Sequence, residues 1–203
     1  MFTGIVEETG AVRHCRPSGA GFELAIDCGR VLEGTRLGDS IAVDGVCLTV
    51  TALDDRGFVT GLAPETRSRT ALDALEAGAR VNLERSVTPS TRMGGHFVQG
   101  HVDATGTIEA FREDADALWV TIAAPPELMR YIVPKGYVAL DGTSLTVVNV
   151  EEHRFDVTLV AYTRAHIVLP TREVGDRVNI EVDVLGKYVE RLLAHRARDE
   201  RAA

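Results

Sequence analysis

Apolar and polar residues alternate along several short stretches of the chain, which is the pattern of strands that bury one face. Positions 22–26 alternate Phe, Leu and Ile with Glu and Ala, and positions 178–184 alternate Val and Ile with polar residues. The pairs Asp44–Gly45 and Asp141–Gly142 lie between apolar runs, where a two-residue turn with positive φ at both positions would close a hairpin. About six such strands fit into roughly 90 residues, and closure would remove the exposed edges of so short a sheet. The pattern therefore predicts an all-β chain of small closed barrels.

Helical spacing appears at the C-terminal end of the chain. Apolar residues recur there at intervals of three and four, while charged residues occupy other positions. The apolar residues are Leu185, Tyr188, Val189, Leu192 and Leu193. Two interpretations stay open for this helix: it folds back on its own barrel, or it packs against equivalent helices in an oligomer. Shorter helical stretches are expected after Gly29 and after the proline pair at 125–126, which suits a helix start.

The chain repeats itself once. Segment 78–84 recurs 97 positions later, and segments 44–50 and 62–67 recur at the same offset. Segment 4–10 recurs 96 positions later, so a single inserted residue separates this block from the others. Because the repeated unit has the size of a domain and occurs only twice, solenoids and propellers, which stack many short units, are excluded. The repeat predicts two tandem domains of the same fold.

The boundary between the two copies is marked by composition. Segment 86–95 is polar, contains a proline and two adjacent glycines, and falls where the first copy ends, so we expect it to be a linker. The predicted organisation is one barrel over residues 1–90, a second barrel over residues 96–184, and a C-terminal oligomerisation helix over residues 185–203.

Composition and charge narrow the class of partner. The chain has 203 residues, 45% of them hydrophobic and 26% charged, with a formal net charge of -8. An acidic chain does not favour nucleic-acid binding, so we expect a small-molecule partner. No apolar run reaches the length of a membrane helix and no signal peptide is visible, so we expect no membrane association and a cytoplasmic location. Cys15, Cys28 and Cys47 form no Cys-x-x-Cys pair, which argues for reduced thiols and against a disulfide framework or a structural zinc site.

Generic catalytic motifs are absent from the sequence: there is no P-loop, dinucleotide fingerprint, nucleophile elbow or zinc-protease helix. His96 and His101 are five positions apart in a strand-like stretch, which places them on opposite faces and argues against a shared metal. A structural role stays open for each histidine. Asp183 lies near the end of the last strand, where the first copy has Ser86, and a solvated carboxylate is the alternative interpretation for it.

A more specific signal follows each predicted hairpin. Cys47 and Thr49 in the first copy correspond to Ser144 and Thr146 in the second, and residues two apart on a strand share a face. Each pair can therefore line a pocket, although a solvated surface is the alternative. The Cys47 thiol is not expected to be an activated nucleophile, because its equivalent is a serine and no base is adjacent in sequence.

Three stretches carry a resemblance to a known family. They are Met-Phe-Thr-Gly-Ile-Val-Glu-Glu-Thr-Gly at 1–10, Gly-Asp-Ser-Ile-Ala-Val-Asp-Gly-Val-Cys-Leu-Thr-Val-Thr at 38–51 and Gly-Gly-His-Phe-Val-Gln-Gly-His-Val-Asp at 94–103. The chain resembles the riboflavin synthase family over essentially its whole length. The resemblance implies two six-stranded Greek-key barrels, one lumazine bound in each, a C-terminal helix and a homotrimer held partly by these helices. It further suggests an association with lumazine synthase.

The resemblance also implies a reaction. Two molecules of 6,7-dimethyl-8-ribityllumazine exchange a four-carbon unit and give riboflavin and 5-amino-6-ribitylamino-uracil, the last step of riboflavin biosynthesis, catalysed by a transferase with no metal or redox cofactor. A proton leaves the acidic 7-methyl group of the donor molecule, and a nucleophile adds to the acceptor. The paired pockets are expected to meet across subunits, so we expect monomers to be nearly inactive.

Site residues follow from the resemblance by position. The first lumazine pocket would comprise Gly4, Ile5, Val6, Cys47, Leu48, Thr49, Gly61, Leu62, Ala63, Pro64, Glu65 and Thr66. The second would comprise Gly100, His101, Val102, Lys135, Ser144, Leu145, Thr146, Thr158, Leu159, Val160, Ala161, Tyr162 and Thr163. Catalysis is expected to need Phe2, Cys47, His101, Ser144, Thr146 and Asp183.

The two copies differ at positions that could divide the roles. Ile5 corresponds to His101, Cys47 to Ser144, and Glu65 to Tyr162. Such differences would let one pocket hold the donor and the other the acceptor, and the sequence leaves open which is which. Tyr162 departs from the Glu or His expected before the following threonine, which puts the ribityl contacts of the second pocket in doubt.

Other classes of protein compete with this interpretation. A non-catalytic lumazine or flavin carrier, such as a fluorescent antenna protein, would be expected to have lost one pocket, whereas both copies here keep the threonine and the hairpin. A flavin-reductase barrel would need a nicotinamide domain, for which two barrels in 203 residues leave no room. A structural β module without a ligand is the least specific alternative.

Overall fold

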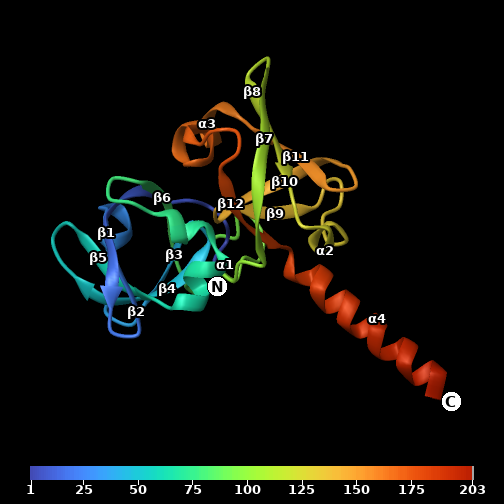
Figure 1. Ribbon diagram of the computed structural model, residues 1–203, viewed down its shortest axis with the longest axis horizontal. Coiled ribbons are helices and arrows are strands. Elements are labelled where there is room, and N and C mark those ends of the chain that lie inside the picture. Colours follow the sequence, from blue (N-terminus) through green and yellow to red (C-terminus); the bar gives the residue numbers. More distant parts are fainter. Residues whose placement is uncertain (203) are drawn as a thin grey trace.

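Two β-barrels lie side by side, and a long helix projects from the second (Figure 1). The computed structural model describes residues 1–202 of the chain, with side chains described up to residue 195. The first barrel comprises β1 (Glu8–Ser18), β2 (Gly21–Asp27), β3 (Ser40–Val43), β4 (Val46–Leu53), β5 (Gly57–Leu62) and β6 (Arg80–Arg85). The second comprises β7 (Ala104–Asp114), β8 (Ala117–Ala123), β9 (Tyr137–Leu140), β10 (Thr143–Val150), β11 (Arg154–Leu159) and β12 (Arg177–Val182).

Both barrels close in the same strand order. The first runs β1-β2-β5-β4-β3-β6, and the equivalent strands of the second follow the same cyclic order, all neighbours being antiparallel. Even the register irregularity between Val12 and His14 recurs between Ile108 and Ala110. The predicted fold class, two tandem six-stranded barrels with a repeat, is confirmed.

Short helices connect the strands. The predicted helical stretches after Gly29 and at 125–126 are present as the 3-10 turn η1 (Arg30–Leu32) and the helix α2 (Pro126–Met129). The helices α1 (Pro64–Arg69) and α3 (Ala161–His166) were not expected from the sequence, and neither were the 3-10 turns η2 (Ala71–Ala74) and η3 (Leu169–Thr171) that follow them. A signal was available for α1, because Pro64 stands in its first turn, where a missing N–H costs no hydrogen bond.

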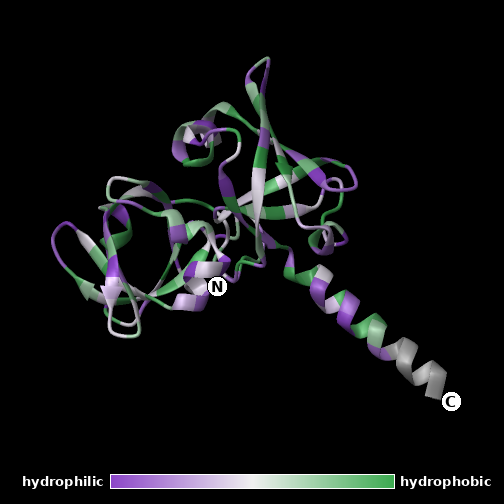
Figure 2. Ribbon diagram, viewed as in Figure 1, coloured by the Kyte–Doolittle hydropathy of each residue, from purple (hydrophilic) through white to green (hydrophobic). Residues whose placement is uncertain are grey.

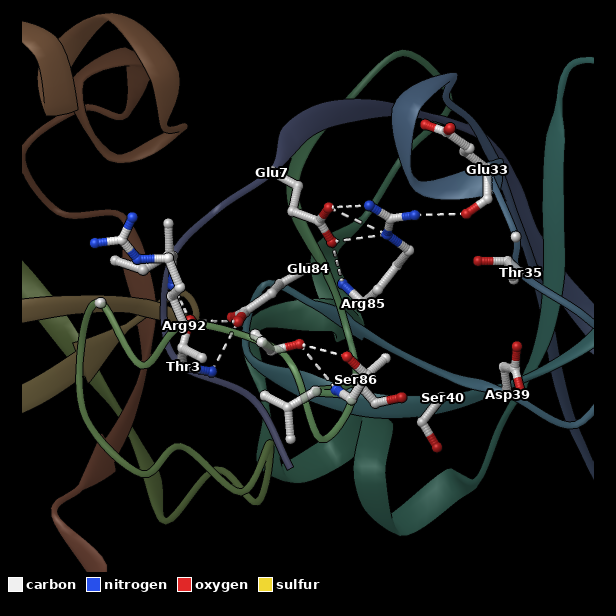
Figure 3. Close-up of a pocket in the computed structure, with 16 residues that line it drawn as sticks. Thr3, Glu7, Glu33, Thr35, Asp39, Ser40, Glu84, Arg85, Ser86 and Arg92 are labelled. Carbon is white, nitrogen blue, oxygen red and sulfur yellow. Dashed lines mark hydrogen bonds and ion pairs between the residues drawn. The ribbon is translucent and has the colours of Figure 1, made fainter.

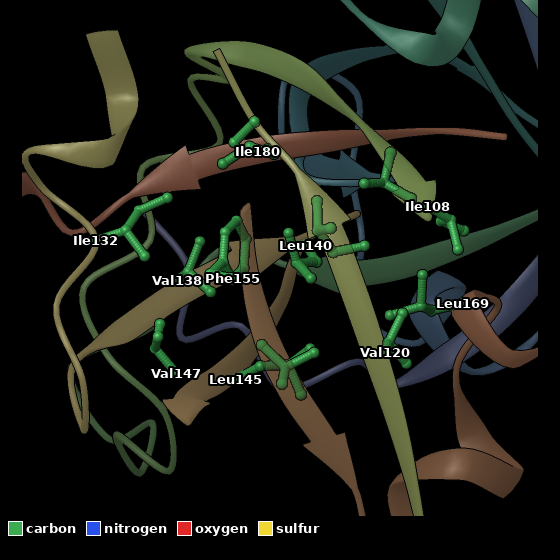
Figure 4. Packing of buried hydrophobic residues seen from close by; sticks show 14 of the residues in the cluster. Ile108, Val120, Ile132, Val138, Leu140, Leu145, Val147, Phe155, Leu169 and Ile180 are labelled. Carbon is green, nitrogen blue, oxygen red and sulfur yellow. The ribbon is translucent and has the colours of Figure 1, made fainter. Parts of the chain in front are cut away.

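Each barrel has its own hydrophobic core, built from the inward positions of its alternating strands. In the second barrel Val120, Leu140 and Phe155 are at most 1% exposed and point into the interior (Figure 4). Burying a Val, Leu or Phe side chain of this kind contributes about 1.5–3 kcal/mol relative to exposure, so the cores hold the barrels together. This alternation fixes which residues of a strand face outward and are free to form a site.

The two predicted hairpin turns are present and touch each other. Asp44 and Asp141 have φ of 43°, and Gly45 and Gly142 have φ of 77°, so both turns take the positive-φ conformation that favours the Asp-Gly pair. A Cβ placed on Gly45 would lie 2.6 Å from the backbone nitrogen of Gly142, and a Cβ on Gly142 would lie 2.7 Å from that of Gly45. No side chain fits at this contact between the barrels.

Polar side chains cross between the barrels beside these turns. Asn82 donates to the carbonyl of Asp141 at 2.9 Å, and its equivalent Asn179 donates to the carbonyl of Asp44 at 2.8 Å. The two buried aspartates share Arg172, whose Nη2 lies 3.2 Å from Asp44 Oδ2 and 3.7 Å from Asp141 Oδ2. Burial raises the pKa of Asp141 to about 6, and burial together with the neighbouring Asp141 raises that of Asp44 well above its ordinary value. Arg172 opposes both shifts and is the cation of this junction.

The C-terminal helix α4 (Val184–Ala202) projects away from the barrels (Figure 1). Near its start it is tied to the second barrel, where Arg130 donates to Glu190 at 2.8 Å and Lys187 lies 2.7 Å from Asp103. Its apolar side chains, Leu185, Tyr188, Val189, Leu192 and Leu193, are 55–70% exposed. Hydrophobic and hydrophilic residues alternate along the part of α4 that precedes residue 196 (Figure 2). The interpretation in which this helix folds back on its own barrel is therefore wrong.

None of the helices in the described part of the chain is both long enough and apolar enough to span a membrane.

Candidate functional site

The segments that precede the two barrels cross each other between them. Phe2 and Val98 pair as a short antiparallel bridge, with the amide of Phe2 donating to Val98 at 2.7 Å and the amide of Val98 donating back at 3.2 Å. Phe2 is completely buried and packs in a small cluster with Val98, Ala42, Ala139 and Cys47. Phe2, predicted to be needed for catalysis, therefore lies beneath Cys47 with no exposed surface.

Each segment then contacts the strand of the other copy that carries the candidate site. The carbonyl of Gly4 accepts from the amide of Ser144 at 2.8 Å, and the carbonyl of Gly100 accepts from the amide of Cys47 at 2.8 Å. A Cβ on Gly4 would lie 2.5 Å from Ser144 Cβ, which explains why glycine is required at this approach. Val6 packs against the core of the second barrel.

The grouping of pocket residues by sequence position is therefore incomplete. It places Gly4–Val6 with Cys47 and Gly100–Val102 with Ser144, whereas these contacts run crosswise. Val102 completes the exchange, because it packs against the core of the first barrel. The predicted division into barrels at 1–90 and 96–184 does not describe these contacts, in which the first segment of each copy packs against the other barrel.

Two buried glutamates hold the crossing segments, and neither was among the residues predicted from the sequence. Glu84 accepts hydrogen bonds from the amides of Thr3 and Gly4 at 2.7 and 2.9 Å, and Glu181 accepts from the amides of Gly100 and His101, both at 2.9 Å. Burial raises the pKa of both carboxyls, and these amide bonds oppose the rise. The available signal was their place at the end of the most visible repeat, segment 78–84 and its copy.

The predicted pairs of polar residues do share a face. On β4, Cys47 is half-buried and Thr49 is exposed, and on β10 Ser144 and Thr146 have the same arrangement. The residues between them, Leu48 and Leu145, are each 6% exposed and belong to the barrel cores. Both are predicted pocket residues, and with side chains turned inward only their backbone could meet a ligand. The candidate sites are thus on the outer faces of β4 and β10.

The two outer faces differ in the histidine beside them. Ser144 Oγ lies 2.7 Å from Nδ1 of His96, whose ring stacks on Tyr137 with centroids 5.2 Å apart. His96 is only 7% exposed, so burial lowers its pKa, although the Asp183 carboxylate opposes this. His101 is exposed and follows Gly100, which contacts Cys47. Cys47 and Ser144 therefore stand in different chemical surroundings.

The remaining predicted residues of the first pocket lie where β5 runs into α1. Gly61, Ala63 and Pro64 are exposed, the side chain of Leu62 is in the core, and Thr66 is half-buried. A cavity of about 300 Å³ is lined here by Gly61, Leu62 and Ala63 together with Phe22 and Thr51. Glu65 pairs with Arg69 on the surface of α1 at 3.1 Å.

Residues 158–163 occupy the equivalent place in the second barrel, where β11 runs into α3. Thr158 and Thr163 are half-buried, Leu159 is in the core, and Val160 and Ala161 are exposed. Tyr162 is 74% exposed and stacks on His166 with centroids 4.1 Å apart. Its ring lies on the outside of α3 at the position where the first copy has the ion-paired Glu65.

Two predicted residues lie near the end of the second barrel that carries α4. Asp183 accepts a hydrogen bond from the amide of Leu185 at 3.0 Å, which satisfies a free N–H in the first turn of α4. Together with Tyr137 and Val189 it lines a groove of about 530 Å³ between α4 and the barrel. Lys135 is exposed in a turn with φ of 66°.

A larger cavity of about 700 Å³ lies beside the N-terminal segment (Figure 3). Ile5 is the predicted pocket residue in its lining, which also includes Ser40, Arg85 and Arg92. Arg85 donates to Glu7 at 3.0 Å, so this cation is already paired. Among residues 1–195, no group of three or more His, Cys, Asp or Glu side chains is placed to hold a metal ion.

Comparison with known proteins defines the class to which this fold and site belong. The family model of the lumazine binding domain matches twice, over residues 3–86 and 99–183. The solved structure of LumP complexed with riboflavin has the same fold, with a TM-score of 0.83 over 90% of this chain and 99% of that chain at 23% identity. The chain is therefore a protein with two lumazine-binding domains.

Relatives with curated names make the family more specific. The riboflavin synthase of Schizosaccharomyces pombe is 46% identical over 195 residues, covering 95% of this chain and 94% of that protein. The riboflavin synthase of Bacillus subtilis is 40% identical over 201 residues, covering 99% and 93%. The riboflavin synthase of Mycobacterium bovis is 46% identical over 204 residues, covering 95% and 98%. The chain belongs to the riboflavin synthase family.

Proposed function

We propose that this chain catalyses the exchange of a four-carbon unit between two molecules of 6,7-dimethyl-8-ribityllumazine, giving riboflavin and 5-amino-6-ribitylamino-uracil. The observation that carries the proposal is the near full-length similarity to riboflavin synthases, together with two equivalent outer faces on β4 and β10. The enzyme is a transferase and acts at the last step of riboflavin biosynthesis. The carrier alternative is not favoured by these relatives.

The duplicated fold suits a reaction between two identical molecules. Two related sites can hold donor and acceptor in a nearly symmetric stack, and holding reacting groups at attack distance can contribute roughly 7–11 kcal/mol to catalysis. The remaining tasks are a proton transfer from the 7-methyl group and addition of a nucleophile to the acceptor. Ordinary acid and base side chains accomplish such steps.

Each site is assembled from residues of both copies. The crossing segments support a first site in which the outer face of β4, with Cys47 and Thr49, is joined by 100–102. By the same argument Ser144 and Thr146 of the second site are joined by 4–6. Residues 61–66 and 158–163 extend the two sites, and Lys135 and Tyr162 belong to the second. Phe2 acts from beneath Cys47 as a positioning residue.

The active unit is a homotrimer held partly by α4. The support is the helix itself, which leaves five large apolar side chains 55–70% exposed along a projecting element. Such a face is typical of a surface that another chain covers. In this arrangement the first site of one subunit faces the second site of its neighbour. We also propose an association with lumazine synthase. A cytoplasmic location is proposed as well, because it suits three free cysteines.

The stoichiometry of the reaction tests the proposed function. The purified chain is mixed with the ribityl-lumazine, and lumazine, riboflavin and the pyrimidine are quantified by chromatography. We expect two lumazines to be consumed for each riboflavin and each pyrimidine formed. Binding of lumazine without either product would support a carrier and refute the proposal.

Truncation tests the oligomer. A chain ending at residue 184 lacks α4 but retains all twelve strands, so we expect folded monomers with little activity. Analytical ultracentrifugation and turnover are measured on the same sample. Full activity in a monomer would contradict a site shared between subunits.

A further inference from the structure

The hydrogen bond between His96 and Ser144 distinguishes the second site from the first. His96 Nδ1 lies 2.7 Å from Ser144 Oγ, whereas no side chain in the described part of the chain hydrogen-bonds to the thiol of Cys47, the equivalent residue. The histidine comes from the end of the linker, outside the strands of either barrel. It is not one of the residues that the family resemblance selected.

The surroundings of His96 hold its ring in one place. Its amide donates to the carbonyl of Thr3 at 3.1 Å, and its ring lies nearly parallel to that of Tyr137, with 8° between the planes. The side chain is 7% exposed, and its Nε2 has no hydrogen-bond partner although it is buried. A buried polar nitrogen without a partner is costly and is common where a group has a catalytic use.

The charge state of the pair follows from this burial. Burial lowers the pKa of His96, so its ring is neutral at neutral pH, and Asp183 is the carboxylate whose charge acts on it. With the ring proton on Nε2, Nδ1 accepts the Ser144 hydroxyl proton. The Ser144 oxygen then presents its lone pairs at the outer face of β10, as a hydroxyl does beside a neutral imidazole.

We propose that His96 is a positioning residue that orients the Ser144 hydroxyl as a proton acceptor, so that the second barrel is the site where the proton leaves the 7-methyl group of the donor lumazine. The inference rests on the proposed function. The C–H bond of the 7-methyl breaks and its electron pair passes into the lumazine ring system. The proton goes to Ser144 Oγ while the Ser144 proton goes to His96 Nδ1, and Asp183 stabilises the resulting imidazolium. The first barrel, with Cys47, then holds the acceptor.

A double-mutant cycle tests the coupling between the two residues. The variants are His96→Phe, which keeps a ring to stack on Tyr137, Ser144→Ala, and the combination. We expect His96→Phe to lower kcat at least about a hundredfold, the lower end of the range for a proton-transfer group, while KM for lumazine changes less than about twofold. In the Ser144→Ala background, the same change should lower kcat by less than about twofold, because the two residues act as one unit.

The matched control is the equivalent residue of the first barrel. In a Cys47→Ala background, His96→Phe should still cause its full loss of kcat, because the two belong to different sites. Equal losses in the Ser144→Ala and Cys47→Ala backgrounds would overturn the proposal. If circular dichroism shows that His96→Phe does not fold, the cycle is run with His96→Asn, which has no basic nitrogen to take the proton.

The outcomes separate the two proposals. A wild-type chain that binds lumazine and forms no riboflavin refutes the proposed function. A wild-type chain that forms riboflavin while the cycle is additive leaves the proposed function standing and refutes only the role of His96.

Discussion

Removing Arg172 should weaken the junction between the two barrels. Its guanidinium lies between two buried carboxyls, 3.2 Å from Asp44 and 3.7 Å from Asp141. The equivalent residue of the first copy is Leu75, so Arg172→Leu is a change that the repeat itself suggests. The variant leaves two aspartates, 1% and 0% exposed, beside each other without a cation.

The size of the effect follows from burial. Breaking a buried ion pair by removing one partner costs about 3–5 kcal/mol. A pKa of about 6 for Asp141, against an ordinary 3.8, already corresponds to roughly 3 kcal/mol that ionisation costs the wild-type fold. Since each kcal/mol shifts the melting temperature by about 2–4 °C in a chain of this size, Arg172→Leu should lower it by roughly 6–20 °C.

The pH dependence has a defined sign. Because the folded pKa of Asp141 is raised, its contribution to the free energy of unfolding is fully present below the unfolded pKa of 3.8 and is lost as pH rises through about 6. Without Arg172 the folded pKa rises further, so the loss continues above pH 6. The difference in stability between wild type and variant should therefore be larger at pH 7.5 than at pH 5.

Denaturant unfolding at these two pH values, at fixed protein concentration, measures both quantities. Arg164→Leu is the control, because its pair with Glu113 is about half exposed and such surface pairs contribute roughly 0–1 kcal/mol. Adding Asp44→Asn to Arg172→Leu should restore part of the stability by removing one of the two carboxylates. An Arg172→Leu variant as stable as the control, or one destabilised equally at both pH values, would refute this reasoning.

Three further changes test the crossing segments and the sites. Gly100→Ala places a Cβ 2.7 Å from Cys47 Cβ at a positive φ, and should lower both the melting temperature and turnover. Gly19→Ala is the control, because its φ is also positive but nothing lies within 4 Å, so it should cost only about 1–2 kcal/mol and leave turnover intact. Equal effects of the two variants would contradict the close approach of Gly100 to Cys47. Glu181→Gln should lower the melting temperature by weakening charge-assisted hydrogen bonds from three backbone amides, each worth about 1.5–3 kcal/mol. An unchanged melting curve would argue that Glu181 does not hold this segment in place. Cys47→Ser should keep most of kcat, because no side chain in the described part of the chain hydrogen-bonds to the thiol to activate it as a nucleophile. An inactive variant with normal lumazine affinity would indicate thiol chemistry.

Much of the fold could be predicted from the sequence because its signals are local. Strand alternation gave the inward positions of β4 and β10, and so placed Cys47 with Thr49 and Ser144 with Thr146 on shared faces. The Asp-Gly pairs predicted both turns, because few other residues adopt positive φ twice in succession. The repeat at offset 97 then required the second domain to copy the first.

The parts that could not be predicted depend on contacts between distant segments. The repeat is equally compatible with a segment that contacts its own barrel and with one that contacts the other barrel. It therefore does not reveal that the segments around Gly4 and Gly100 contact the opposite barrels. The sequence next to Arg172, between Thr171 and Glu173, does not indicate that its guanidinium lies between two aspartates from different barrels. The contact of His96 with Ser144 joins residues 48 positions apart in the chain, which no local pattern encodes.

Complementation between damaged subunits tests directly whether the two unequal barrels each supply half of one active site. Thr49→Trp and Thr146→Trp fill the outer faces of β4 and β10 at exposed positions, so each variant should fold and be inactive by itself. When the two variants are co-expressed, we predict that activity returns, because an intact first site of one subunit meets an intact second site of another. Mixed oligomers that stay inactive, or either variant retaining wild-type turnover alone, would contradict it.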